Sequence, residues 1–179
     1  FPLGARDNND SAVLTLAVLE NGKILAGGKF TMLSHDLVQL NADGTVDRSF
    51  IPEIPADGHV VAIVVQADGK ILLSITDEWT QNMVIRLNAN GTRDHAFQLD
   101  QQAIARIIYP GIDFGMNGNA SGTAPYTLAL QGDGKILLSS EFQRDRYFLN
   151  IVLARLNADG TVDASFTPSI FAGSAGYDH

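Results

Sequence analysis

Three short apolar stretches recur along the chain, and each one ends at a dipeptide that favours a tight turn. The stretches are Val13–Leu19, Val60–Val65 and Tyr126–Leu130. In the middle copy, HVVAIVVQ, apolar residues do not alternate with polar ones, which is typical of a β-strand buried on both faces. The dipeptides favour a type I′ hairpin turn because Asn, Asp and Gly accept positive φ. They are Asn21-Gly22, Asp68-Gly69 and Asp133-Gly134.

The remainder of each unit predicts three more strands. The second strand follows the turn directly, at Lys23–Ala26, Lys70–Ile75 and Lys135–Ser139. The third strand lies at Asp36–Leu40, Met83–Leu87 and Asn150–Leu156. A second turn and a short fourth segment follow, and the segment ends in Phe50, Phe97 or Phe166. The pattern predicts a four-stranded antiparallel sheet in each unit. Its turn glycines are Gly22, Gly44, Gly69, Gly91, Gly134 and Gly160.

Two motifs occur together, in the same order, in all three units. The first reads (A/V)-Q-x-D-G-K-I-L and the second R-L-N-x-D-G-T-x-D-x-x-F, with departures at Leu19, Gln39, Asn90 and Arg93. Over residues 12–170 this combination resembles the delta-sixty repeat, a bacterial β-propeller repeat. The resemblance implies an all-β fold, a partial β-propeller of three four-stranded antiparallel blades, and no shared activity. A β-trefoil, which closes with three four-stranded units and often binds sugars, is the alternative.

The repeats divide residues 1–179, taken as one repeat domain, into blades. Residues 12–50 form the first blade, 58–97 the second, 98–125 an insertion, 126–170 the third blade and 171–179 a tail. Closed propellers typically have about 4–8 blades, so three blades leave an apolar face open at each end. One face lies around Leu16 and the other around Ile151–Leu153. We expect these faces to contact further blades, a second copy of the chain or another protein.

The composition limits the classes of partner that the chain can bind and bears on its cellular location. The net charge is −8 at pH 7 and there is no basic cluster, so nucleic acid is excluded as a partner. No apolar run is long enough for a membrane helix, so no membrane insertion is expected. The absence of cysteine excludes disulfides and thiolate metal sites. The chain begins at Phe1 and not at Met, and together with the resemblance this favours an extracellular or periplasmic location.

The second turn of each unit offers oxygen ligands at alternate positions beside a glycine, as calcium loops do. The carboxylates concerned are Asp43, Asp47, Asp159 and Asp163. An EF-hand needs a longer series of ligands and a bidentate Glu, and neither is present. The favoured interpretation is that these side chains bond the backbone of their own turns. We therefore expect no cofactor, with calcium as the alternative. The lysines after the first turns are interpreted as solvated, or as paired with an Asp of a neighbouring turn.

The chain carries no nucleophile elbow, no phosphate-binding glycine loop and no His-Glu-x-x-His motif. We therefore expect no catalytic residues and no enzyme. Long loops inside a compact repeat are often functional, and aromatic side chains suit a contact surface. The candidates for partner contact are Trp79, Tyr109, Phe114, Met116 and Tyr147.

These features predict a non-enzymatic β-propeller scaffold that mediates protein–protein interaction or assembly. A carbohydrate-binding, lectin-like module is the alternative, in which Trp79, Tyr109 or Tyr147 would stack on a glycan. A subunit of an enzyme or of a larger complex is the third hypothesis.

Overall fold

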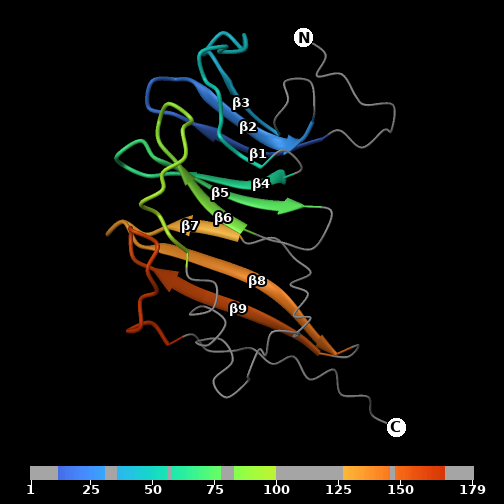
Figure 1. Ribbon diagram of the computed structural model, residues 1–179, viewed down its shortest axis with the longest axis vertical. Coiled ribbons are helices and arrows are strands. Elements are labelled where there is room, and N and C mark those ends of the chain that lie inside the picture. Colours follow the sequence, from blue (N-terminus) through green and yellow to red (C-terminus); the bar gives the residue numbers. More distant parts are fainter. Residues whose placement is uncertain are drawn as a thin grey trace.

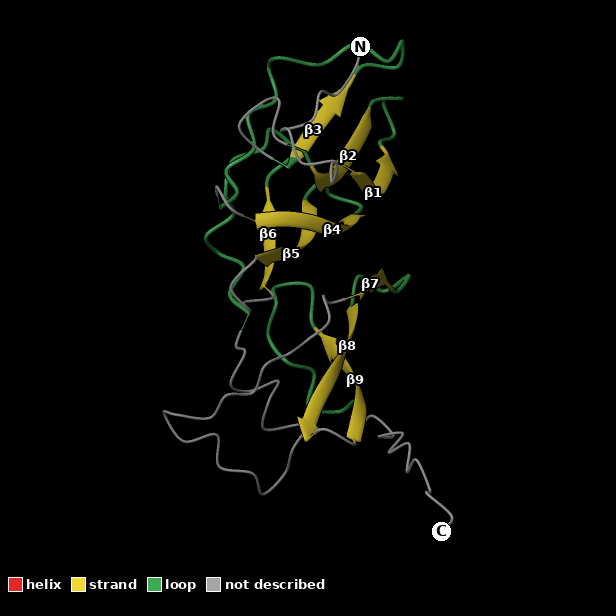
Figure 2. Cartoon of the chain, turned by 90° about the vertical axis from the view of Figure 1, so that its right-hand side faces the viewer, coloured by secondary structure: helices red, strands yellow, loops and turns green. Residues whose placement is uncertain are grey.

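The computed structural model describes residues 12–30, 36–55, 58–77, 83–99, 127–145 and 148–167. These residues form nine β-strands in three separate sheets, which follow one another along the longest axis of the molecule (Figure 1). No helix is present among them, and so none that is long and apolar enough to span a membrane. Seen after a quarter turn, the three sheets keep the same order (Figure 2).

Each sheet is an antiparallel meander of three strands, which we call blades one to three. Blade one contains β1 (Ala12–Val18), β2 (Ile24–Lys29) and β3 (Leu37–Leu40). Blade two contains β4 (Gly58–Val65), β5 (Ile71–Asp77) and β6 (Met83–Leu87). Blade three contains β7 (Thr127–Leu130), β8 (Ile136–Asp145) and β9 (Phe148–Leu156). No described strand of one sheet is hydrogen-bonded to a strand of another, so the units stay separate, as blades do. The partial propeller is confirmed.

The predicted fourth strand is wrong as a strand, because the segment after the second turn pairs at a single point. Val46 bridges Leu40, and the equivalent bridges join Arg93 to Leu87 and Val162 to Leu156. One residue later the chain turns away, since Phe50 N donates to Asp47 O at 3.3 Å. Each blade is therefore a three-stranded sheet with an isolated bridge at its edge.

The predicted type I′ geometry is also replaced by a different turn. Leu19 N donates to Lys23 O at 2.8 Å, and Gly22 N donates to Leu19 O at 2.9 Å. This is the pattern of a three-residue loop that ends in a left-handed residue. Asn21 favours it because its Oδ1 accepts a hydrogen bond from Lys23 N at 3.0 Å. All six turn glycines have positive φ, between 80° and 95°.

The hydrophobic core lies between the sheets, and blade two is covered on both faces. Along β5, Ile71 and Leu73 face blade one while Leu72 faces blade three. All three are at most 1% exposed. A strand with a neighbour on each face can be apolar at every position, which explains the absence of alternation in this blade.

Candidate functional site

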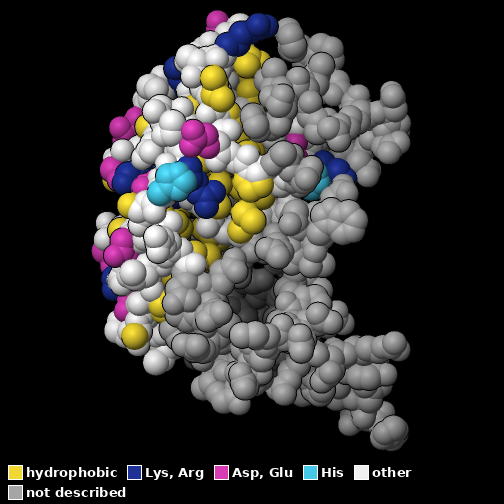
Figure 3. Space-filling view, in the orientation of Figure 1, with side chains coloured by type: hydrophobic (Ala, Val, Ile, Leu, Met, Phe, Trp, Pro, Cys, Tyr) yellow, Lys and Arg dark blue, Asp and Glu magenta, His cyan; other side chains and the backbone are white. Residues whose placement is uncertain are grey.

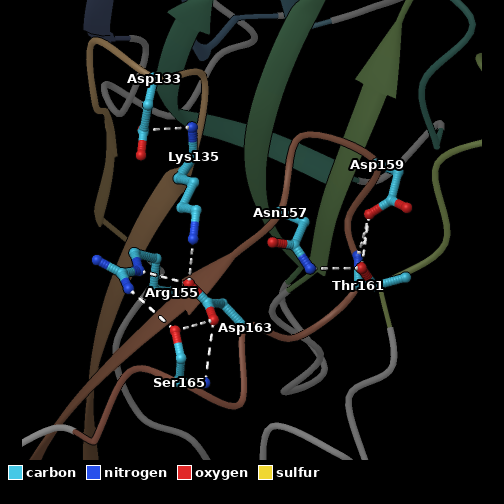
Figure 4. Close-up of polar contacts among 8 residues, drawn as sticks. All are labelled: Asp133, Lys135, Arg155, Asn157, Asp159, Thr161, Asp163 and Ser165. Carbon is cyan, nitrogen blue, oxygen red and sulfur yellow. Dashed lines mark hydrogen bonds and ion pairs between the residues drawn. The ribbon is translucent and has the colours of Figure 1, made fainter.

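The polar centre of each blade is an aspartate just after the second turn. In blade three, Asp163 Oδ2 accepts hydrogen bonds from Lys135 Nζ at 2.6 Å and from Arg155 Nε at 2.8 Å. Its Oδ1 accepts from Ser165 N at 3.0 Å and from Ser165 Oγ at 2.6 Å. Figure 4 shows Asp163 between these three partners, which come from the two hairpins of one blade. The carboxylate therefore ties the hairpins together.

Blade two repeats this arrangement. Asp94 contacts Lys70 Nζ at 3.1 Å and accepts from Arg86 Nε at 2.8 Å and from Ala96 N at 3.0 Å. Burial alone would raise the pKa of Asp94, but its hydrogen bonds with Lys70, Ala96 and Arg86 outweigh burial and lower it. Hydrogen bonds from Lys135 and Ser165 likewise hold the pKa of Asp163 below its ordinary range.

Blade one keeps the lysine but has Gln39 where the other blades have arginine. Lys23 Nζ donates to Asp47 Oδ2 at 2.7 Å, and Ser49 Oγ donates to Asp47 Oδ1 at 2.6 Å. These contacts, that with Lys23 foremost, lower the pKa of Asp47 from 3.8 to about 2. The lysine that the sequence places after each first turn is thus paired with an aspartate of the same blade.

Asp43 and Asp159, the other two calcium candidates, bond their own turns. Asp43 Oδ1 accepts from Thr45 N at 2.9 Å and from Thr45 Oγ1 at 2.6 Å. Asp159 makes the same two contacts with Thr161 (Figure 4). Among the described residues, no three His, Asp or Glu side chains gather where they could hold a metal ion. These contacts are those of turn capping.

The phenylalanine at the end of one blade packs against the second-turn glycine of the next blade. A Cβ atom at Gly160 would lie 2.7 Å from Phe97 Cε2. At Gly91 it would lie 3.2 Å from Phe50 Cε2 and 2.8 Å from Ile51 O. Only glycine fits beneath these groups, because real Cβ contacts are longer. Phe50 and Phe97, 9% and 6% exposed, therefore close the two inter-blade junctions.

An arginine strengthens the junction between blades two and three. Arg86 lies with its Cζ 4.7 Å from the centre of the Phe97 ring, a cation–π distance. Its Nη1 donates to Ala158 O, in the turn of blade three, at 2.5 Å. Arg86 thus contacts both the ring and the turn that the ring covers.

At the junction of blades one and two, the imidazole of His59 contacts the carboxylate of Asp36. Their Nδ1 and Oδ2 atoms are 2.5 Å apart, and Asp36 Oδ1 also accepts a hydrogen bond from Phe30 N at 2.7 Å. The sequence did not reveal this pair because the two residues lie on different blades. The predicted contact residues Trp79, Tyr109, Phe114, Met116 and Tyr147 lie outside the described residues.

A family model described as "Domain of unknown function (DUF5122) beta-propeller" matches residues 19–50, 66–97 and 131–166. These segments together make up more than half of the chain. The chain belongs to this family. Each DUF5122 segment runs from the first turn of a blade to its end phenylalanine, and so includes the paired lysine and aspartate, the second-turn glycine and the phenylalanine of the junction.

Solved structures similar to this DUF5122 chain include a catalytically inactive variant of virginiamycin B lyase from Staphylococcus aureus with quinupristin, and a glucose dehydrogenase. Both are 15% identical to this chain, with TM-scores of 0.44 and 0.46. The alignments cover 88% and 87% of this chain but 56% and 49% of those chains. The chain thus spans about half the length of these structures, and their activities are not carried over. No curated protein matches the sequence.

Proposed function

We propose that this chain is a non-enzymatic β-propeller scaffold, built of delta-sixty repeats, that mediates protein–protein assembly through its open blade faces. The observation that carries the proposal is the exposure of Leu16 on β1, at 63%. The residues at the same repeat position, Ile63 and Leu128, are only 9% and 8% exposed because another blade covers them. Blade one thus presents to solvent a face that the other blades bury.

Further apolar residues of β1 are exposed near Leu16, and Val18, two positions along the strand, lies on the same face. Val18 is 74% exposed, and Val13 and Leu14 are 45% and 53% exposed. Fully burying a side chain of this kind stabilises an assembly by about 1.5–3 kcal/mol. Contiguous exposed apolar residues mark interaction surfaces in soluble proteins. The face of blade one is therefore suited to a protein partner.

The charged groups described above favour assembly over catalysis. The carboxylates of Asp47, Asp94 and Asp163 have lowered pKa values and are held by lysine or arginine. A general acid or base works best with a pKa near the operating pH. These carboxylates stay ionised at neutral pH, which suits a structural role. In the space-filling view, acidic and basic side chains lie interspersed along one edge of the described surface (Figure 3).

Sedimentation velocity over a concentration series tests the proposal. We expect the wild-type chain to associate, and the double variant Leu16→Lys, Val18→Lys to associate at least about tenfold more weakly, because it places two charges on the apolar face. Ile51→Lys is the matched control, since Ile51 is also exposed, at 66%, but lies beside an inter-blade junction that is already closed. A wild-type chain that stays a compact monomer at every concentration would contradict the proposal.

A further inference from the structure

We propose that the open end of blade three binds the second turn of blade one from another copy of this chain, so that copies join head to tail. The binding group is Arg155 with Phe166, here called the plug, and the bound group is the turn Asn41–Thr45, here called the socket. This inference rests on the proposed function and names its partner.

The junction between blades two and three shows how a plug and a socket fit. There Arg86 and Phe97 form the plug, and the turn Asn157–Thr161 is the socket. Arg86 Nη1 donates to Ala158 O at 2.5 Å, and the ring of Phe97 lies against Gly160. As a result Gly160 and Phe97 are both buried.

The plug of blade three already has the geometry of the occupied one. The Cζ of Arg155 lies 4.7 Å from the centre of the Phe166 ring, the same distance as between Arg86 and Phe97. Arg155 Nε donates to Asp163 at 2.8 Å, as Arg86 Nε does to Asp94. Phe166 is nevertheless half-buried, whereas Phe97 is 6% exposed. The plug is therefore preorganised, and binding a socket would complete its burial.

The socket of blade one is open and has a matching sequence. Asn41–Thr45 and Asn157–Thr161 both read Asn-Ala-Asp-Gly-Thr. Gly44 has φ 83° and is exposed, and among the described residues no atom lies within 4 Å of the place of its Cβ. Gly91 and Gly160, at the closed junctions, are buried. Blade one therefore presents the same turn sequence with which blade three receives the Phe97 ring. No phenylalanine ring packs on the turn of blade one among the described residues.

The charges at the plug and socket positions favour the same pairing of blade three with blade one. At the junction of blades one and two, both positions are neutral, because Gln39 stands in the plug position and Asn90 in the socket position. At the next junction both positions are charged, as Arg86 and Asp159. Thr161 has the largest effect in lowering the pKa of Asp159, and the charge of Arg86 lowers it further.

The open plug and the open socket are both charged as well. Arg155 would face the turn that carries Asp43, and so would reproduce the charged junction and not the neutral one.

The apolar faces continue the same interface. In the two closed junctions, one face of blade two packs against blade one and the other against blade three. Leu16 and Val18 lie on the open face of blade one, and Leu153, 38% exposed, lies on blade three. The plug lies on blade three and the socket on blade one, so each copy uses one of each. Such contacts close into rings or continue as filaments.

Three variants, one at the socket and two at the plug, test the proposal by sedimentation velocity. Gly44→Asn places a side chain where the ring of Phe166 would lie, and Asn tolerates positive φ. Arg155→Gln introduces the residue that blade one has at this position, and Phe166→Ala is a second variant at the same end. We expect each to weaken self-association at least about tenfold, since such anchor residues dominate interface energies.

Mixing the two blocked chains gives the decisive measurement. The Gly44→Asn chain retains its plug and the Arg155→Gln chain retains its socket, so the mixture should form a one-to-one heterodimer that does not grow further. Gly134→Asn is the matched control, because Gly134 also has φ 83° and open space around it but lies at a first turn. This variant should associate like the wild type. Circular dichroism checks that every variant is folded.

The outcomes separate this inference from the proposed function. If the wild-type chain never associates, both are wrong. If it associates but Gly44→Asn and the two variants at the plug change nothing, the head-to-tail pairing is wrong while the scaffold role stands. A mixture of the two blocked chains that yields no heterodimer likewise overturns the pairing.

Discussion

In each blade a lysine forms an ion pair with an aspartate far from it in the sequence, and this pair connects the two hairpins of the blade. Lys23 and Asp47 are partly buried, with side-chain exposures of 33% and 11%. Exposed ion pairs contribute little to stability, but Asp47 also accepts two hydrogen bonds from Ser49. The ionised carboxylate is thus favoured by the folded state.

This preference predicts a loss of stability in acid. The pKa of Asp47 in the folded chain, about 2, lies below the ordinary value of 3.8. A lowered pKa adds stability that is full above the ordinary value and is lost as the pH falls through the folded value. The free energy of unfolding, measured with urea, should therefore fall between about pH 4 and pH 2.

Replacing the cation tests the cause of this pH dependence. Lys23→Gln should flatten the fall in that window, because Lys23 makes the largest contribution to the shift. Glu20→Gln is the control, since Glu20 is exposed in the first turn, and it should leave the profile unchanged. An unchanged profile in Lys23→Gln would refute the assignment.

At this scale the sequence predicts contacts within a blade better than contacts between blades. The recurrence of Lys after the first turn and Asp after the second indicates a pairing that each unit repeats. The pair between Asp36 and His59 has no such repetition, because neither residue recurs in the other units. Only the stacking of the sheets brings these two side chains together.

At the scale of the elements, alanine variants of two second-turn glycines distinguish the cost of backbone strain from the cost of lost packing between blades. Gly44→Ala should destabilise the chain by about 1–3 kcal/mol, the cost of a non-glycine residue at positive φ. Gly91→Ala should cost more, because its Cβ would lie 2.8 Å from the backbone oxygen of Ile51, the residue after Phe50 at the end of blade one. The added clash should be worth about 1–3 kcal/mol, measured by urea unfolding of both variants. Equal losses in the two variants would show that the junction adds nothing.

The positions of the elements could be predicted, but two details of their geometry could not. Dipeptides such as Asn21-Gly22 locate a turn, yet the same residues fit a two-residue or a three-residue loop. The structure selects the longer loop, in which the Asn21 side chain bonds the backbone of Lys23. The fourth strand fails for a similar reason, because Asp47 bonds Ser49 and turns the chain after one bridge.

At the scale of the whole molecule, the described residues of the middle blade pack against a blade on each face, and those of each outer blade pack against one blade. This difference should appear in amide hydrogen exchange, which reports local opening. Among the central strands, β5 should exchange at least about tenfold more slowly than β2 and β8, since blades contact only their neighbours. The measurement belongs at low protein concentration, where copies do not associate. Equal rates in all three strands would mean that the blades open as one unit.

The propeller architecture could be predicted from sequence because the repeat recurs three times and apolar residues fill both faces of the middle unit. The way in which blades lock was not predicted. Phe97 reads as an ordinary core residue, and Gly160 as an ordinary turn glycine. Their contact depends on the stacking of blades two and three, which no local pattern encodes.

The end phenylalanines also bear on how such a chain can lengthen by gene duplication. A copied segment that runs from just after one phenylalanine through the next, such as residues 51–97, encodes a glycine turn for the ring before it and a ring for the turn after it. Tandem duplication at this boundary supplies, in one event, a glycine turn for every ring and a ring for every inner turn. A breakpoint between the turn and the phenylalanine would separate a blade from its own ring.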